Sequence, residues 1–285
     1  MRDEKGGAGS GANDDETLND QNDSGTGGEK GGANDEKEVD YWYRSGEMTV
    51  DVTIGTGDRG DKTVTASVVD GTMLFEGDIY LGKVEDLGDP QVEGIGRTGS
   101  QFRWPGGRIP FVINPALPNK DRVLMAIKHW TDNTKIRLVP RSTEKDYVEF
   151  VDEGGCHSAV GRMGGRQVIS LGSGCSTGSA IHEIGHAVGL WHEQSREDRD
   201  KFIEVIKVNI KPKSAHNFNQ HILDGDDLGK YDFGSIMHYP PTAFSINNQP
   251  TIRARVPLPP GVVMGQRNGL SEGDKAAVRA LYPDL

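Results

Sequence analysis

The stretch HEIGHAVGLWHE, residues 182–193, constrains the fold of this chain more than any other part of the sequence. His182 and His186 are four positions apart, so on a helix both imidazoles project from one face and can bind the same metal ion. Glu183 follows the first histidine and can reach a water molecule on that metal. The spacing therefore predicts a helix that carries two metal ligands and a candidate general base.

The third histidine of this stretch requires the chain to turn. If the helix continued, His192 would lie about 9 Å beyond His186 along the axis and about 100° away from the face that His182 and His186 share. Gly189 can adopt the positive φ that ends a helix. Three neutral imidazoles with an open position are the arrangement of a catalytic zinc site, whereas structural zinc sites are closed. The extended pattern HExxHxxGxxH is far more specific than HExxH alone, and it predicts zinc-dependent hydrolysis.

A second motif, SIMHY at residues 235–239, supports this interpretation. In metzincin proteases a methionine-containing turn lies beneath the zinc site, and Met237 matches that position. A methionine alone more often fills a core, so this match depends on the first motif. Tyr239 is close enough in sequence to the turn to place a phenol beside the metal.

Most of the negative charge lies in the first 40 residues. The formal net charge is -11 at pH 7, and residues 1–40 contain 12 Asp or Glu against 4 Lys or Arg. This Gly-, Asp- and Asn-rich tail cannot bury enough apolar surface to offset its ordering entropy, so we expect a disordered spacer. The charge says little about the partners of the folded part, and we expect no nucleic-acid partner. No apolar run approaches the ~20 residues that span a membrane, and none resembles a signal-peptide core.

After the tail, an exposed connector separates two regions. Residues 41–93 contain short β-like runs, and the connector at 91–103 contains Arg97 and Arg103, which a trypsin-like protease could cut. The following residues have the pattern of a compact α/β domain, with a loop-rich lobe at 193–265. Strands are expected at 108–113, 136–140, 146–151 and 167–172, and helices at 119–134, at 176–190 and from Ser271 onward. The buried face of the first helix is expected to carry Val123, Leu124, Ile127 and Trp130.

The chain contains two cysteines, Cys156 and Cys175. They could be two buried free thiols, as in an intracellular protein. The even number and the short enclosed loop instead favour a disulfide formed in an oxidising compartment.

The two motifs resemble the signatures of the astacin family of zinc endopeptidases. HEIGHAVGLWHE has Glu193 directly after the third histidine, and SIMHY has the tyrosine of the second signature. RWPGGRIPFVI, GCHSAVGRMGGRQVISLGSGC and LSEGDKAAVRALY also resemble astacin segments, so the likeness covers most of residues 100–285. It implies an α+β metzincin fold of two lobes with a central active-site cleft. A disordered tail at 1–40 and a small β-rich inhibitory prosegment at 41–97 would precede a catalytic domain at 98–285.

The resemblance implies a role for each residue that matches the signatures. His182, His186 and His192 would bind one catalytic Zn²⁺. Tyr239 would be a further zinc ligand that swings away to stabilise the oxyanion, and Glu183 would act as general base and then as general acid.

Supporting roles follow from the same resemblance. Met237 would lie in the turn beneath the zinc, and Glu193 would pair with the N-terminal amine formed on activation. Cys156 and Cys175 would form one family disulfide. A second disulfide typical of the family has no cysteines here, so packing alone would hold the loop-rich lobe.

TMLFEGDIYLG, residues 72–82, looks like a strand that is interrupted in its middle. By itself the interruption could be a hairpin turn. Astacin prosegments resemble this stretch in an FxGD motif whose aspartate binds the catalytic zinc in place of water, and Phe75, Gly77 and Asp78 match that motif. We therefore expect a zymogen in which Asp78 blocks the zinc until the prosegment is cut off within about residues 93–103.

The resemblance also implies protein or peptide substrates, an activating trypsin-like protease and a secreted or cell-surface location, and we expect a monomer. One alternative is a catalytically idle zinc-binding recognition module, against which Glu183 and Tyr239 argue. Another is a separate adhesive β-domain at 41–93. Arg253 and Arg255 could line a substrate subsite, although a charged strand edge is the commoner role. The remaining histidines lack metal-ligand spacing and are expected to be structural or solvent-facing: His129, His157, His216, His221 and His238.

Overall fold

The computed structural model of the chain describes residues 42–55, 61–87, 102–220 and 227–285. The acidic tail, most of the connector including Arg97, and His221 lie outside these residues, so the predictions made for them stay predictions. Among the described residues, no helix combines the length and the apolar character that crossing a bilayer requires.

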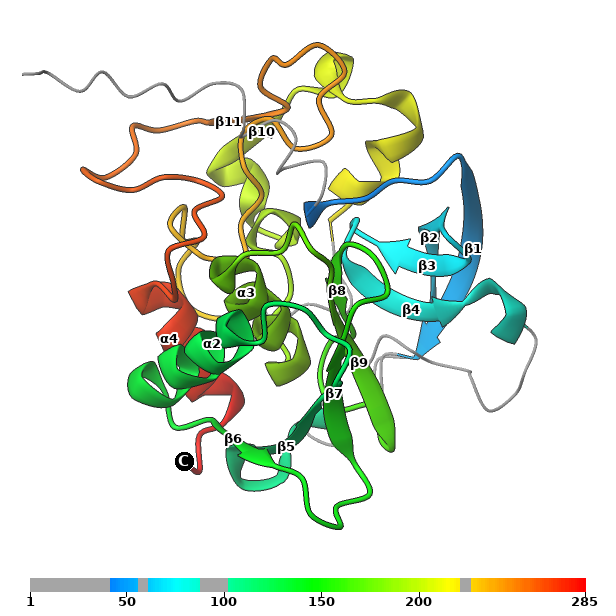
Figure 1. Cartoon of the computed structure of the whole chain (residues 1–285). Coiled ribbons are helices and arrows are strands. Elements are labelled where there is room, and N and C mark those ends of the chain that lie inside the picture. The colour runs from blue at the N-terminus through cyan, green and yellow to red at the C-terminus, as the bar shows by residue number, and fades with distance from the viewer. Residues whose placement is uncertain (1–41, 56–60, 88–101, 221–226) are drawn as a thin grey trace, which may run out of the picture. The chain divides into compact units, whose positions relative to one another are not determined.

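The described strands form one nine-stranded sheet and one two-stranded sheet. The bounds in the large sheet are Met48–Gly55 (β1), Asp61–Val69 (β2), Thr72–Phe75 (β3), Ile79–Lys83 (β4), Arg108–Ile113 (β5), Arg137–Pro140 (β6), Tyr147–Val151 (β7), Cys156–Ser158 (β8) and Arg166–Leu171 (β9). Their order is β1-β2-β3-β4-β8-β9-β7-β5-β6 (Figure 1). The first four strands pair antiparallel with one another in chain order, and β5 pairs parallel with both β6 and β7.

Strand β4 joins the N-terminal strands to the rest of the sheet. Ile79 of β4 pairs in parallel with Ser158 of β8, and the backbone N–H of Ser158 donates to the carbonyl of Asp78 at 3.0 Å. Residues 42–87, which we call the N-terminal segment, therefore continue the sheet of the following domain. This shared sheet argues against a separate β-domain at 41–93, because β4 leaves no free edge toward β8.

Helices α2 (Asp121–Asn133) and α3 (Thr177–Val188) pack on each other and on strands of the sheet (Figure 1). Ser176 caps α3, since its hydroxyl accepts from the backbone N–H of Ser179 at 3.1 Å. Two indoles brace the helix: Trp130 Nε1 donates to the carbonyl of Ile181 at 3.0 Å, and Trp104 Nε1 donates to the carbonyl of Ala187 at 2.8 Å. The histidine helix is thus held at two points along its length.

The expected burial along α2 is wrong at one position. Val123 and Trp130 are buried and Ile127 is half-buried, but Leu124 is 51% exposed. Ala126 is buried instead. Positions 123, 126, 127 and 130 follow the i, i+3, i+4, i+7 spacing of one helical face, and position 124 lies about 100° away from position 123.

The described residues after α3 form few long regular elements, as expected. They contain β10 (Ile203–Val205) and β11 (Ile252–Ala254), which pair antiparallel, and end with α4 (Glu272–Leu281) capped by Ser271. The short 3-10 helices of the described chain are Val84–Asp86 (η2), Pro105–Gly107 (η4), Glu193–Ser195 (η5), Arg199–Lys201 (η6), Lys207–Asn209 (η7) and Pro212–Phe218 (η8). An apolar cluster holds this lobe, and its buried members are Ile203, Ile210, Phe218, Tyr231, Phe233, Tyr239, Ala243, Phe244, Ile252 and Met264, joined by Tyr43 from the N-terminal segment.

Cys156 and Cys175 form a disulfide, with their Cα atoms 5.9 Å apart. The bond links the start of β8 to the residue before the cap of α3. The alternative of two free thiols is therefore wrong, and the expected disulfide is confirmed.

We expect the double variant Cys156→Ala/Cys175→Ala to be less stable by about 3 kcal/mol, because the disulfide, which joins residues 19 positions apart, no longer closes a loop in the unfolded chain. For a domain of this size such a loss lowers the Tm by roughly 6 to 12 °C. Calorimetry of the variant and of the reduced parent chain should give matching decreases. An unchanged Tm in both samples would mean that the disulfide does not stabilise the fold.

Candidate active site

Helix α3 places His182 and His186 side by side, with ring centroids 4.7 Å apart. His182 Nδ1 donates to the carbonyl of Ile236 at 2.8 Å, and His186 Nδ1 donates to the carbonyl of Leu190 at 2.9 Å. A carbonyl can only accept, so the proton lies on Nδ1 in both rings. Each neutral ring therefore presents the lone pair of Nε2 to the space between them.

The chain turns after α3 as the glycine predicts. Gly189 has φ 120°, and its N–H donates to the carbonyls of Gly185 at 3.1 Å and His186 at 2.8 Å. This turn brings His192 back beside α3. Its ring centroid lies 5.4 Å from that of His182 and 4.8 Å from that of His186. The three imidazoles are buried together in one compact group.

Asp78 of the N-terminal segment reaches this group. Its Oδ2 lies 3.1 Å from His182 Nε2, and its Oδ1 lies 3.7 Å from His186 Nε2 and 3.2 Å from His192 Nε2. The four candidate ligand atoms all lie within 4.8 Å of one another. Asp78 ends the turn that joins β3 to β4, so this stretch is a hairpin turn and also brings a carboxylate to the histidines.

The donor set fits one zinc ion. Three imidazole nitrogens and one carboxylate oxygen are ordinary zinc ligands, and the set holds no thiolate or further oxygen cage that would favour another metal. Two of the buried donor atoms, Asp78 Oδ1 and His186 Nε2, have no hydrogen-bond partner among the described residues. A cation between the four donors would satisfy both atoms.

Glu183 lies beside the ligands but outside their group. It is 1% exposed, and its Oε2 has no hydrogen-bond partner in the described part of the chain. Burial raises the pKa of its carboxyl well above the usual range, and the negative charge of Asp78 adds to this effect. In its ionised form, which a nearby metal cation would favour, the unpartnered oxygen of Glu183 can accept a proton from a water molecule at the metal.

The SIMHY turn lies against the helix of the first two histidines. A Cβ atom added to Gly185 would lie 2.8 Å from Met237 Sδ. The thioether therefore packs directly on the part of α3 between His182 and His186. Tyr239 is fully buried, and its hydroxyl donates to the carbonyl of Glu76 at 2.5 Å. Its ring centroid is 4.9 Å from that of His192.

Glu193 lies outside the group of four donors. Its Oε1 accepts from the backbone N–H of Asp232 at 2.7 Å and lies 3.5 Å from Arg196 Nη1. Burial raises the pKa of this carboxyl to about 8, although Arg196 opposes the shift.

Comparison with known proteins identifies the protein family of this chain. The profile of the family described as Astacin (Peptidase family M12A) matches residues 97–283. The chain belongs to the astacin family. The match covers both the histidine-bearing and the methionine-bearing motif, and Zn²⁺ is the cofactor that suits both the family and the four donors.

Individual astacin relatives agree with the family profile. The chain is 38% identical to zinc metalloproteinase nas-13 of Caenorhabditis elegans over 77% of its length, and 37% identical to astacin-like metalloprotease toxin 1 of Loxosceles intermedia over 75%. Residues 97–285 make up about two thirds of the chain, whereas the match to nas-13 covers 77% of it. This match therefore extends into the region before residue 97. The chain spans 52% of the nas-13 protein and 83% of the toxin.

A solved structure confirms the fold. High choriolytic enzyme 1, a hatching enzyme zinc-protease of the fish Oryzias latipes, superimposes with a TM-score of 0.60 at 38% sequence identity. The superposition covers 65% of this chain and 96% of the fish enzyme. The expected α+β astacin-like fold is therefore confirmed.

Sequence reasoning missed three residues near the astacin site. Tyr43 is buried beside His182 and His192, with its ring centroid 4.4 Å from that of Tyr239, and its hydroxyl accepts from Arg267. Glu76 is fully buried against His192. A charged residue inside the FxGD match was a signal for Glu76, but no local pattern indicates Tyr43 or Arg267.

The other four histidines of the described residues lie outside the donor group. His129 Nε2 accepts from the backbone N–H of Leu270 at 3.0 Å, and His238 is buried between Tyr231 and the backbone of its own neighbour. His157 is buried, and burial lowers its pKa to about 4. His216 Nε2 lies 3.1 Å from the hydroxyl of Ser67 in the N-terminal segment.

Two further features include none of the four candidate donors. Arg253 pairs with Glu204 across β10 and β11 at 2.6 Å, which is the strand-edge role. Arg255 Nε donates to the carbonyl of Ile203 at 3.0 Å.

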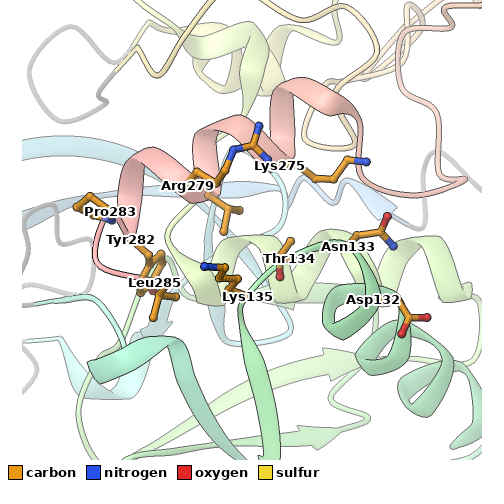
Figure 2. Close-up of a pocket in the computed structure, with 10 residues that line it drawn as sticks. Asp132, Asn133, Thr134, Lys135, Lys275, Arg279, Tyr282, Pro283 and Leu285 are labelled. Atoms are coloured by element: carbon orange, nitrogen blue, oxygen red, sulfur yellow. The ribbon is translucent and has the colours of Figure 1, made fainter.

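A cavity of about 430 Å³ lies beside α2 and α4 (Figure 2). None of the four donors lines it, and its lining consists of Asp132, Asn133, Thr134, Lys135, Lys275, Val278, Arg279, Tyr282, Pro283 and Leu285.

Proposed function

We propose that this chain is the latent precursor of an astacin zinc metalloendopeptidase, which Asp78 keeps closed until a prosegment at 41–97 is cut from a catalytic domain at 98–285. The observation that carries the proposal is the position of Asp78, whose carboxylate lies among the Nε2 atoms of three histidines. That position is the one that an attacking water molecule would need. The similarity to nas-13 extends before residue 97, which is compatible with a prosegment there.

His182, His186 and His192 would hold the zinc ion in the active enzyme. When bound, zinc lowers the pKa of a water molecule toward ~7 and polarises the peptide carbonyl. Glu183 would accept the proton of the attacking water and deliver it to the departing amine, which completes the hydrolysis. Tyr239 would donate a hydrogen bond to the oxyanion. In the latent chain its hydroxyl already donates to the carbonyl of Glu76, so this donor is not available.

The N-terminal segment would block the site by more than one contact. Asp78 is on the same chain as the histidines, so its effective concentration at the metal would be of order mM for a flexible connection. The pairing of β4 with β8 and the buried ring of Tyr43 hold the segment in place. A cut within about residues 93–103 would break the covalent link between this segment and the catalytic domain. The candidate cut position is near Arg97, which lies outside the described residues.

Activation would also create a new amine. Glu193 is the candidate partner for this amine, because the backbone N–H of Asp232 binds only its Oε1 and its side chain is largely buried. A cation beside it would lower the raised pKa of its carboxyl and stabilise the charged form.

We further propose that the enzyme acts on protein or peptide substrates, that a trypsin-like protease activates it, and that it is a monomer. We also propose a secreted or cell-surface location. The disulfide between Cys156 and Cys175 supports an oxidising compartment.

The purified chain is expected to contain one zinc ion and to cleave casein only after brief treatment with trypsin. A chelator should reduce the activity of the trypsin-treated sample to background, and added zinc should restore it, since hydrolysis needs the metal. Metal analysis and a casein assay before and after trypsin test both parts. No cleavage in any sample despite one bound zinc would favour the idle recognition module, whereas full activity before trypsin would contradict latency.

A further inference from the structure

Glu76 is a buried carboxylate that belongs to the N-terminal segment but whose side chain contacts the following domain. It has no exposed surface, and its φ is 48°, which is rare for a residue with a side chain. Its Oε2 lies 2.7 Å from His192 Nδ1, and its Oε1 accepts from the hydroxyl of Ser195. Each oxygen thus has a partner in that domain, so the orientation of the carboxylate is fixed.

The three zinc-binding histidines differ in how their second nitrogen is satisfied. His182 and His186 donate from Nδ1 to the backbone carbonyls of Ile236 and Leu190, which stay with the catalytic domain. His192 instead donates from Nδ1 to Glu76. Such a partner fixes the tautomer and orientation of a ligating imidazole and increases its strength as a ligand. A cut before residue 104 would therefore remove the Nδ1 partner of His192, whereas the described partners of His182 and His186 would stay in place.

We propose that Glu76 is a positioning residue of the latent form, which orients His192 toward the metal and makes the latent chain hold zinc more tightly than the activated enzyme does. This inference rests on the proposed zymogen function, because it requires that the segment leaves on activation. It is separate from the role of Asp78, since Glu76 acts on Nδ1 of one ligand and is not among the four candidate metal donors.

The backbone around Glu76 keeps the contact in register. The carbonyl of Glu76 accepts from Tyr239, and the carbonyl of Gly77 accepts from the N–H of Arg44 at 2.9 Å. Gly77 has φ 81°, and a Cβ there would come within 2.7 Å of the Phe244 ring. These contacts do not involve the Glu76 side chain, so its replacement leaves the turn in place and tests the carboxylate alone.

The test measures how fast the uncut full-length chain loses zinc to a colorimetric chelator. Glu76→Ala is expected to lose zinc about 10- to 100-fold faster than the parent, which is the usual effect of removing such a partner. Glu76→Gln is the conservative control: its amide oxygen can accept from His192 Nδ1, and the hydroxyl of Ser195 can in turn accept from its amide nitrogen. This variant should therefore stay within about 3-fold of the parent.

Trypsin treatment followed by removal of the released segment supplies the internal control. Residue 76 is then absent, so the parent and Glu76→Ala should give the same activity and the same rate of zinc loss. Equal values also show that the variant folded. Zinc loss from uncut Glu76→Ala at the parental rate, or from Glu76→Gln as fast as from Glu76→Ala, would overturn the proposal. A parent chain that trypsin does not activate would contradict the zymogen proposal instead, while the comparison between uncut variants would still report on Glu76.

Discussion

Asp78→Ala is expected to make the uncut chain proteolytically active. Without the carboxylate, a water molecule can occupy the fourth position among the three Nε2 atoms. The gain should be at least about 10-fold over the uncut parent, because a ligand present at an effective concentration of order mM is lost. It should remain below the activity of the trypsin-treated parent, since β4 stays paired with β8 and Tyr43 stays buried near the histidines. Cleavage of a fluorogenic peptide before and after trypsin measures both limits.

Asp61→Ala is the matched control for this gain. Asp61 is an exposed carboxylate in the same segment, at the start of β2, so its loss removes an equal charge without reaching the metal site. The control should be as silent as the uncut parent. If Asp78→Ala is equally silent while trypsin activates it normally, Asp78 is not what closes the site.

Glu183→Gln is expected to reduce kcat of the trypsin-treated enzyme by about 10³-fold, because the amide cannot accept the proton of the attacking water. The fall should appear in kcat and in kcat/KM together, as for an interaction made in the transition state. Zinc content should stay at one ion per chain, because Glu183 is not one of the four donors. The amide has nearly the shape of the carboxylate, so the buried position is preserved.

Glu197→Gln makes the same chemical change at an exposed position, between the short helices η5 and η6. It should leave kcat within about 2-fold of the parent, as surface substitutions usually have small effects. Wild-type activity in Glu183→Gln, with zinc bound and this control also active, would exclude Glu183 as the general base.

Local sequence patterns predicted most of the elements but not how they meet. Helices with a cap and a regular apolar spacing, such as α3 after Ser176, are specified within a dozen residues. The strand β8 has three residues, which are too few to show a period, and its pairing with β4 depends on a segment far away in the chain. The exposure of Leu124 was mispredicted for a related reason, because the sequence does not say which of two overlapping faces of α2 meets α3.

The sequence by itself determined the metal chemistry of this protein. The spacing of His182, His186 and His192 requires a helix followed by a turn, and both requirements are local rules of backbone geometry. The tertiary structure decided what meets those histidines. Asp78 is 104 positions away from His182, and Glu76 is 116 positions away from His192. Such contacts depend on the register of β4 against β8 and on burial of the whole turn, which are properties of the packed chain and of no short stretch within it.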